Sequence, residues 1–203
     1  MRITAGKLAP SLILALVLAV PSVLAQEKQG DAAMQEMMKK WQEAMTPGAP
    51  HKALAGLEGE WNAEVKSWMN GPDAPPSVSQ GKCTMKMVFG GRYLEQEFTS
   101  EMMNMPFSGM GFTGYDNVNK KYVGFWIDNM STGMSTMEGS MTPAGDVLTM
   151  YGKMDDVTTG EHGKNMKYVT KMEGPDKQVF AVYDLSMDDA KSKMMEIVYT
   201  RRK

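Results

Sequence analysis

The chain has 203 residues with 22 basic and 24 acidic side chains, a formal charge of −2, and one cysteine. Without a basic excess, or a basic patch interleaved with aromatic residues, a nucleic-acid partner is not expected. One thiol cannot form an internal disulfide, and the length suits one domain with a sizeable core.

The first 25 residues have the pattern of a secretory signal peptide. Arg2 and Lys7 precede an apolar run at residues 8–20, and small or aliphatic residues at 23–25 precede a cleavage point before Gln26. The apolar run is shorter than the roughly 20 residues that a membrane-spanning helix needs. We therefore expect export to a periplasm or out of the cell. Removing 25 of the 203 residues leaves 178, with a formal charge of −4 and no membrane span.

A helical pattern follows at residues 31–45, where apolar side chains recur at three- and four-residue steps. Asp31 is a suitable N-cap, and Pro47 with Gly48 ends the helix. The apolar face either packs on the domain or docks on a partner, and both alternatives stay open. A second short helix is expected at residues 51–57. The apolar face of the first helix consists of Met34, Met37, Met38, Trp41 and Met45.

From residue 61 onward the pattern changes to the two-residue alternation of β-strands, separated by Gly, Pro, Asn and Asp. No helical pattern occurs after residue 57. Consecutive hairpins predict one antiparallel sheet, either a sandwich or a closed all-β barrel of about ten strands, and the barrel is favoured because it leaves no edges. The expected strands are residues 61–69, 78–89, 92–101, 109–115, 121–129, 132–141, 146–153, 165–173, 178–187 and 194–202.

These patterns divide the chain into three parts. Residues 1–25 are the signal peptide, residues 26–50 are an amphipathic helix with a linker, and residues 51–203 are the barrel domain. Within the barrel, residues 102–106 are expected to form a loop, because Pro106 cannot donate a hydrogen bond to a sheet.

Five short fragments occur in an order that resembles a known bacterial family. The family is domain of unknown function 1579, and the resemblance covers about residues 50–203. Because the activity of that family is not established, the resemblance implies a domain and no catalytic residues. The fragments are HKALAGLEGEW at 51–61, GYD at 114–116, YVGFWID at 122–128, EGS at 138–140 and YTRRK at 199–203.

A looser similarity connects the chain with lipocalin-like (calycin) barrels. In those barrels a Gly-x-Trp on the first strand and a basic residue on the last form a latch, in which the basic side chain covers the indole. By resemblance, Gly59 and Trp61 would pair with Arg201 or Arg202. A guanidinium over an indole is favourable by roughly 0.5–2 kcal/mol. The resemblance also implies that the barrel interior is the ligand cavity.

Methionine is unusually abundant. After residue 25 there are 22 methionines, more than the 18 leucines, isoleucines and valines together. Methionine can replace these residues as an adaptable core filler, and its presence in almost every strand favours this interpretation. The alternative is a Cu(I) site of thioether ligands, for which the candidates are Met102, Met103, Met105 and Met110.

No nucleophile elbow, phosphate loop or dinucleotide fingerprint occurs, so the sequence leans away from an enzyme without deciding the question. The leading hypothesis is an exported protein that binds a small apolar ligand inside the barrel, without catalysis and without a cofactor. The alternatives are an envelope copper-binding protein and a protein-interaction module. The residues expected to line the ligand site are Met110, Phe112, Tyr122 and Trp126.

Overall fold

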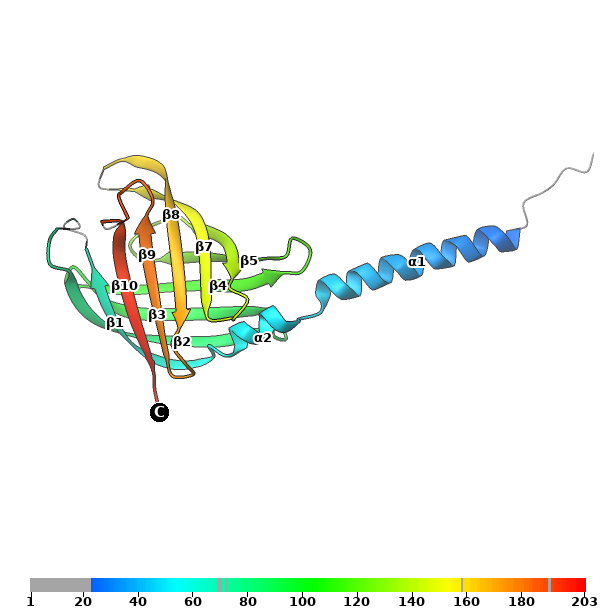
Figure 1. Ribbon diagram of the computed structural model, residues 1–203, viewed down its shortest axis with the longest axis horizontal. Coiled ribbons are helices and arrows are strands. Elements are labelled where there is room, and N and C mark those ends of the chain that lie inside the picture. The colour runs from blue at the N-terminus through cyan, green and yellow to red at the C-terminus, as the bar shows by residue number, and fades with distance from the viewer. Residues whose placement is uncertain (1–22, 69–70, 72, 158, 190) are drawn as a thin grey trace, which may run out of the picture. The chain divides into compact units, whose positions relative to one another are not determined.

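Ten antiparallel strands close into one barrel in the computed structural model of the chain (Figure 1). Each strand pairs with its neighbours in sequence, and β1 pairs with β10 to close the sheet. The structure describes residues 23–68, 71, 73–157, 159–189 and 191–203. The strands are β1 Gly59–Ser67, β2 Ser77–Val88, β3 Tyr93–Met102, β4 Met105–Asp116, β5 Lys121–Asp128, β6 Ser135–Met141, β7 Val147–Asp156, β8 Glu161–Met172, β9 Lys177–Asp184 and β10 Lys193–Arg201.

The predicted closed all-β barrel is therefore confirmed. Successive side chains of a strand point to opposite faces of the sheet, and the core is formed by those that point into the barrel. In β1 Trp61, Ala63 and Val65 are buried. The register places Ala63 opposite Tyr199 and Val65 opposite Ile197 of β10, and these two partners are buried as well. The same face continues around the barrel and forms its interior.

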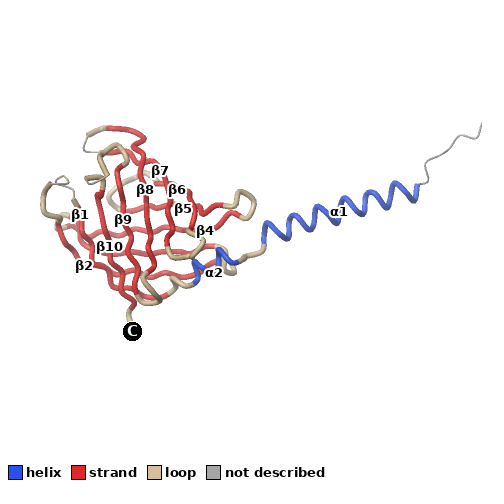
Figure 2. The backbone as a smooth tube through the Cα atoms, in the orientation of Figure 1, coloured by secondary structure: helices blue, strands red, loops and turns tan. Residues whose placement is uncertain are grey.

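Two helices precede the strands, coloured blue in Figure 2. Helix α1, Val23–Met45, ends where the sequence pattern predicts but begins eight residues earlier, so it runs across the expected cleavage point before Gln26. Helix α2, Ala49–Ala55, begins two residues before the predicted start, because Pro50 has the backbone angle that suits a first helical turn. Among the described residues, no helix is long and apolar enough to cross a membrane.

The chain divides into two compact units, residues 1–42 and 43–203. The described part of the first unit belongs to α1. The second unit contains the end of α1, helix α2 and the barrel, and in it α2 packs against β2, β3 and β4. His51 and Leu54 of α2 are buried, which places this helix over one end of the barrel interior.

The loop expected at residues 102–106 is instead a two-residue hairpin turn. Met102 pairs directly with Met105, and the residues between them, Met103 and Asn104, have φ angles of 52° and 60°. Two central residues with positive φ are the signature of a type I′ turn. Pro106 is tolerated because the next pair after such a turn is not hydrogen-bonded, and because β5 begins to pair with β4 only at Gly109.

Candidate functional site

One end of the barrel is closed by the interactions of Trp61. Its indole N–H donates to the Leu57 carbonyl at 3.0 Å, and the Arg201 guanidinium lies over the ring, 4.2 Å from its centroid. Arg201 also donates to the carbonyls of Glu58 and of Gly56, the latter at 3.0 Å. This single side chain therefore ties β10 to β1 and to the end of α2.

The sequence did not decide whether Arg201 or Arg202 covers the Trp61 indole. The structure places Arg201 over the ring. Arg202 instead forms an ion pair with Glu60 at 2.7 Å, and both side chains are exposed. Gly59 is the third member of the arrangement. Its φ is +131°, and a Cβ atom there would lie 2.5 Å from the Arg201 Nη1 atom. Glycine is required at this position both by the backbone angle and by the approach of the guanidinium.

Two of the four side chains expected at the ligand site face the interior. Tyr122 and Trp126 lie on the same face of β5, and both belong to or pack against the buried core. Tyr122 is buried at the end covered by α2, where its hydroxyl contacts the Pro50 carbonyl at 3.4 Å and its ring meets Tyr115 edge-on. Burial raises the pKa of the Tyr122 hydroxyl, and the neighbouring Tyr115 adds a smaller effect in the same direction.

Met110 and Phe112 lie on the opposite, outer face of β4. They alternate with Gly109, Gly111 and Thr113, and Gly111 is the residue that pairs with Trp126. The Phe112 ring stacks on Phe125 of β5, with ring centroids 5.2 Å apart. The aromatic residues of this hairpin are thus split between the two faces, and Tyr122 and Trp126 are the inward pair.

The Trp126 indole lies flat against glycine backbone in the barrel interior. A Cβ atom built on Gly111 would lie 2.8 Å from the indole Cε3 atom, and one on Gly109 would collide with the same ring. The indole N–H donates to the Asp128 carboxylate at 3.1 Å. Although it faces inward, Trp126 is only half-buried. This part of the interior is therefore reached by solvent.

Glycines occupy inward positions on four consecutive strands around Trp126. The register places Gly124 opposite Met137, and Met137 opposite Gly152. In the next row Tyr122 is opposite Gly139. Each large side chain thus has a neighbour without a side chain, which lets rings and backbone approach the wall closely at these positions. The inward glycines of β4 to β7 are Gly109, Gly111, Gly124, Gly139 and Gly152.

A buried ion pair joins β8 and β9 on the inner face. The Lys164 ammonium lies 2.7 Å from the Asp184 carboxylate and 3.3 Å from that of Asp156. Burial acts to raise the pKa of Asp184, but hydrogen bonds from Lys164 and Ser186 outweigh it, so the pKa lies below its ordinary value. The hydrogen bond to Asp184 raises the pKa of Lys164. These groups satisfy one another, which is the pattern of a structural network.

The four methionines proposed as Cu(I) ligands do not gather at one point. Met102 and Met105 pair across the hairpin turn, and Met103 is exposed at its tip. Met110 lies five residues further along β4, about 16 Å away at the rise of a strand. Copper binding by Met102, Met103 and Met105 stays a prediction. Leucine substitution of these three residues, followed by a Cu(I) titration, tests it.

Cys83 is buried in the core on the inner face of β2. Burial raises the pKa of its thiol to about 12, against the opposing effect of a hydrogen bond with Gln96. Because the thiolate is the reactive form, a thiol in this environment is inert at neutral pH. Within the described ranges, no group of three or more His, Cys, Asp or Glu side chains could hold a metal ion.

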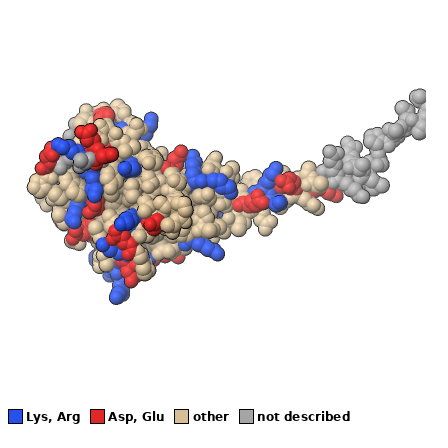
Figure 3. Space-filling view, in the orientation of Figure 1, with Lys and Arg blue, Asp and Glu red and all other residues tan. Residues whose placement is uncertain are grey.

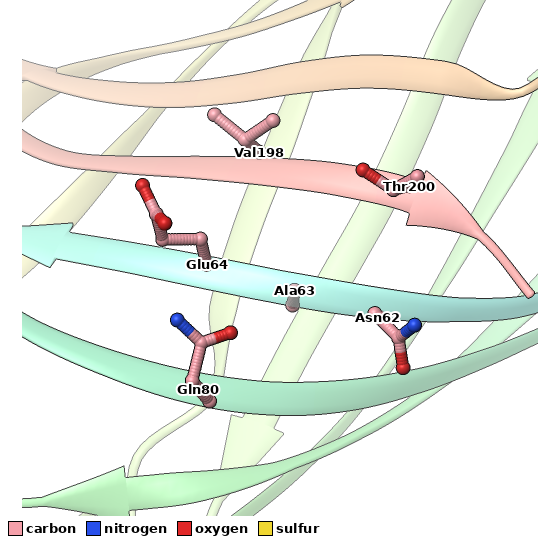
Figure 4. Close-up of a pocket in the computed structure, with 6 residues that line it drawn as sticks. All are labelled: Asn62, Ala63, Glu64, Gln80, Val198 and Thr200. Carbon is pink, nitrogen blue, oxygen red and sulfur yellow. The ribbon is translucent and has the colours of Figure 1, made fainter.

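The outer face carries a depression of about 240 Å³ across β1, β2 and β10. Figure 4 shows its lining side chains, which come from the outward positions of these three strands together with Ala63. Glu64, which lines it, is paired with Lys66 at 3.3 Å. On the face seen in Figure 3, basic and acidic side chains of the barrel are intermingled. Neither feature offers a concentrated charge or an enclosed apolar surface.

The strand order, the closure and the interior together define the class of protein: a closed ten-stranded antiparallel β-barrel whose interior wall is partly built of glycine. The chain belongs to the family of proteins of unknown function called DUF1579, whose model matches residues 46–201. The family resemblance predicted from the sequence fragments is therefore confirmed. No curated protein matches the chain.

Three solved structures are similar to the chain, and the first of them supports the fold. A crystal structure of Rv2717c from M. tuberculosis is similar, with a TM-score of 0.56 at 15% identity over 77% of this chain and 100% of that one. A redesigned β-barrel has a TM-score of 0.41 at 12% identity, over 74% of this chain and 96% of that one. A de novo designed fluorescence-activating β-barrel has a TM-score of 0.41 at 10% identity, covering 74% and 97%.

The sequence analysis missed two features of the interior, and only the second of them had a signal in the sequence. The Lys164–Asp184 pair joins residues 20 positions apart, and nothing in the local pattern of either strand indicates that a charge faces inward. The inward glycines had a visible signal, because Gly109 and Gly111 alternate on one strand and Gly124 follows Tyr122 by two residues. Glycine weakens a strand interior, so its repetition at alternate positions indicates close approach by another group.

Proposed function

We propose that this protein binds a small, mostly apolar ligand in the interior of its barrel, without catalysis. Tyr122 and Trp126 would be among the residues that line the site. The observation that carries the proposal is the placement of Trp126: it faces inward, lies flat over Gly111, and keeps part of its ring exposed to solvent. A flat aromatic surface of this kind stacks well on an apolar molecule.

The dimensions of the barrel support the proposal. Eight-stranded barrels have an interior that side chains can just fill or that holds one small ligand, and the diameter grows with strand number. Ten strands close this barrel, and glycines replace side chains at inward positions of β4 to β7. Less side-chain volume is therefore available to fill a wider space.

The chemistry of the wall favours an apolar ligand. Phe107, Met137 and Met154 pack against the core, and each is half-buried. The inward carboxylates of Asp128 and Asp184 already accept hydrogen bonds, from Trp126 and from Lys164 and Ser186 respectively. A ligand would meet mainly thioether and aromatic surface, with few polar groups to orient it.

A fluorescence titration tests the proposal. The probe is N-phenyl-1-naphthylamine, an uncharged aromatic fluorophore whose emission rises in apolar surroundings. We expect saturable binding, and an increase in Kd of about two- to tenfold for Trp126→Leu, because an aromatic pair contributes about 0.5–1.5 kcal/mol beyond its area. The matched control is Phe112→Leu, which removes an aromatic ring of the same hairpin from the outer face. Absence of saturable binding, or equal effects of the two substitutions, would refute the proposal.

We also propose that the chain is exported, on the basis of the pattern in its first 25 residues. The intact mass of the protein purified from its own cells tests this directly. A mass that corresponds to a chain beginning at Gln26 supports export, whereas a chain that retains all 203 residues contradicts the predicted processing.

A further inference from the structure

The side chain of Gln96 faces the same part of the barrel interior as the side chain of Trp126. Gln96 belongs to β3, where it shares the inward face with Leu94 and Phe98, and both of these are buried in the core. The register places Gln96 opposite Gly111 of β4, and Gly111 opposite Trp126 of β5. The two side chains therefore flank a position without a side chain, and their backbones lie roughly 10 Å apart, which is two strand spacings.

The amide group of Gln96 is oriented by two neighbours in the core. Its Nε2 atom donates to the Tyr199 hydroxyl at 3.2 Å. The hydrogen bond between Gln96 and Cys83 acts to lower the pKa of the Cys83 thiol, which is the effect of an N–H donor on a thiolate. Tyr199 and Cys83 are both buried, so the nitrogen end of the amide points into the core. The carbonyl oxygen lies at the other end of the amide, away from these two groups.

The Gln96 carbonyl oxygen is an acceptor that solvent reaches. Among the described residues no group donates a hydrogen bond to it, and no buried side-chain oxygen or nitrogen of the described chain lacks a partner. An oxygen without a donor is therefore exposed. Because Gln96 points inward and is only half-buried, this exposure is to the interior of the barrel. A ligand in this part of the interior covers the oxygen, and covering it without a hydrogen bond costs free energy.

The polar groups of the interior wall also favour an uncharged donor over an anion. The Lys164 ammonium is already paired with Asp184 at 2.7 Å. The Asp128 carboxylate accepts from the indole N–H of Trp126 and would repel a ligand carboxylate. Ser135 is opposite Trp126 on β6, and its hydroxyl can donate as well as accept, so it does not select between the two kinds of ligand.

We propose that the ligand is a planar, uncharged aromatic molecule with an O–H or N–H group at its edge. The Gln96 carbonyl oxygen accepts a hydrogen bond from that group, while the ring of the ligand stacks on Trp126. This inference rests on the proposed binding of an apolar ligand in the barrel, and it adds the residue that orients the ligand. A site built to hydrogen-bond one group rejects an analogue that lacks it, because the acceptor is then covered without a partner.

A displacement titration tests the inference with 2-naphthol and 2-methoxynaphthalene, which share one ring system. Only the alcohol can donate a hydrogen bond. Each compound is titrated against N-phenyl-1-naphthylamine bound to the purified protein, and the ratio of the two Kd values is compared between wild type and Gln96→Met. Methionine keeps the length of the side chain and removes the amide. We expect the substitution to weaken binding of the alcohol by about two- to tenfold relative to the ether, which is the range of one neutral hydrogen bond.

Gln80→Met is the matched control, because it makes the same change at an outward position of β2, where Figure 4 shows the Gln80 side chain. It should leave the ratio unchanged. Near-ultraviolet circular dichroism verifies the fold of each variant, and Gln96→Leu, which also lacks the amide, replaces a methionine variant that fails to fold.

Two kinds of failure are distinguishable in this experiment. An unchanged ratio in Gln96→Met, or the same change in Gln80→Met, overturns the role of Gln96 while the ligand site stands, since both compounds still bind. A ratio that shifts in favour of the alcohol in Gln96→Met overturns it as well, because the amide would then present its N–H groups to the ligand. If neither compound binds to the wild-type protein, the ligand site is refuted and the inference falls with it.

Discussion

Replacing Arg201 by alanine should destabilise the barrel far more than replacing its neighbour Arg202. Arg201 covers the Trp61 ring, 4.2 Å from its centroid, and donates to the carbonyls of Gly56, Glu58 and Pro175. These contacts connect the last strand with the first strand and with the chain that leaves α2. Removing the side chain therefore loosens the closure of the sheet as well as one contact.

The magnitude follows from these contacts. The cation–π contact contributes about 0.5–2 kcal/mol. A hydrogen bond from a charged donor contributes roughly 1.5–3 kcal/mol. Because the Arg201 side chain is 24% exposed, water can bond to some of the carbonyls that the alanine variant leaves without a donor, which reduces the loss of stability. We expect the free energy of unfolding to fall by about 2–4 kcal/mol in total. For a domain of this size each kcal/mol corresponds to a change in Tm of about 2–4 °C.

Urea unfolding followed by circular dichroism provides the measurement. Arg202→Ala is the control, because Arg202 forms only an exposed ion pair with Glu60, and such pairs contribute about 0–1 kcal/mol. Arg201→Lys should fall between the two, since it keeps the charge and loses the planar fork. If Arg201→Ala costs no more than Arg202→Ala, the assignment of Arg201 as the residue that closes the barrel is refuted.

Three further predictions concern the interior. Because the pKa of Asp184 is lowered in the folded state, its contribution to stability is present above the unfolded value of about 3.9 and is lost as the pH falls through the folded pKa; Asp184→Asn should therefore destabilise at pH 7 and flatten the loss of stability below pH 4, as measured by urea unfolding at each pH. Gly111→Ala should displace the Trp126 ring, which costs about 1–3 kcal/mol and shifts the tryptophan emission; an unchanged emission spectrum would contradict the placement of the indole. Native Cys83 should not react with a thiol reagent at pH 8, where its thiol is protonated, and should react once urea unfolds the chain.

The architecture was accessible to sequence reasoning because the information is local. Alternating apolar residues bounded by Gly, Pro, Asn and Asp identify strands, and their short separation makes them antiparallel neighbours. Asp116 illustrates this: its carboxylate accepts hydrogen bonds from the Val118 and Asn119 amides and so builds the turn between β4 and β5. A sheet of ten such strands has no exposed edge strands only if it closes into a barrel, and the structure is closed.

The sequence alone could not show which face of the β4–β5 hairpin points into the barrel. Both faces of the hairpin are apolar, because Phe112 and Phe125 stack outside while Trp126 lies inside. Periodicity fixes which residues share a face, but a shift of one residue exchanges the faces. The register of the whole barrel decides between them, which is why Met110 and Phe112 were grouped with Tyr122 and Trp126 in the sequence prediction.

Helix α1 and the 102–105 hairpin show a second limit. Met103 and Asn104 adopt positive φ angles, which asparagine tolerates and methionine rarely adopts, so the sequence did not indicate a type I′ turn. The start of α1 at Val23 extends the helix into a segment that the composition assigns to a signal peptide. In the hairpin, the pairing of β3 with β4 overrides the local preference of Met103.

Native mass spectrometry of the protein purified from its own cells tests the central claim most directly. The protein should carry one small organic molecule, released on denaturation, and Trp126→Leu should reduce the fraction that carries it while Phe112→Leu does not. A protein whose native mass equals that of its polypeptide, and which takes up no apolar compound when these are added, would contradict a ligand site in the barrel interior.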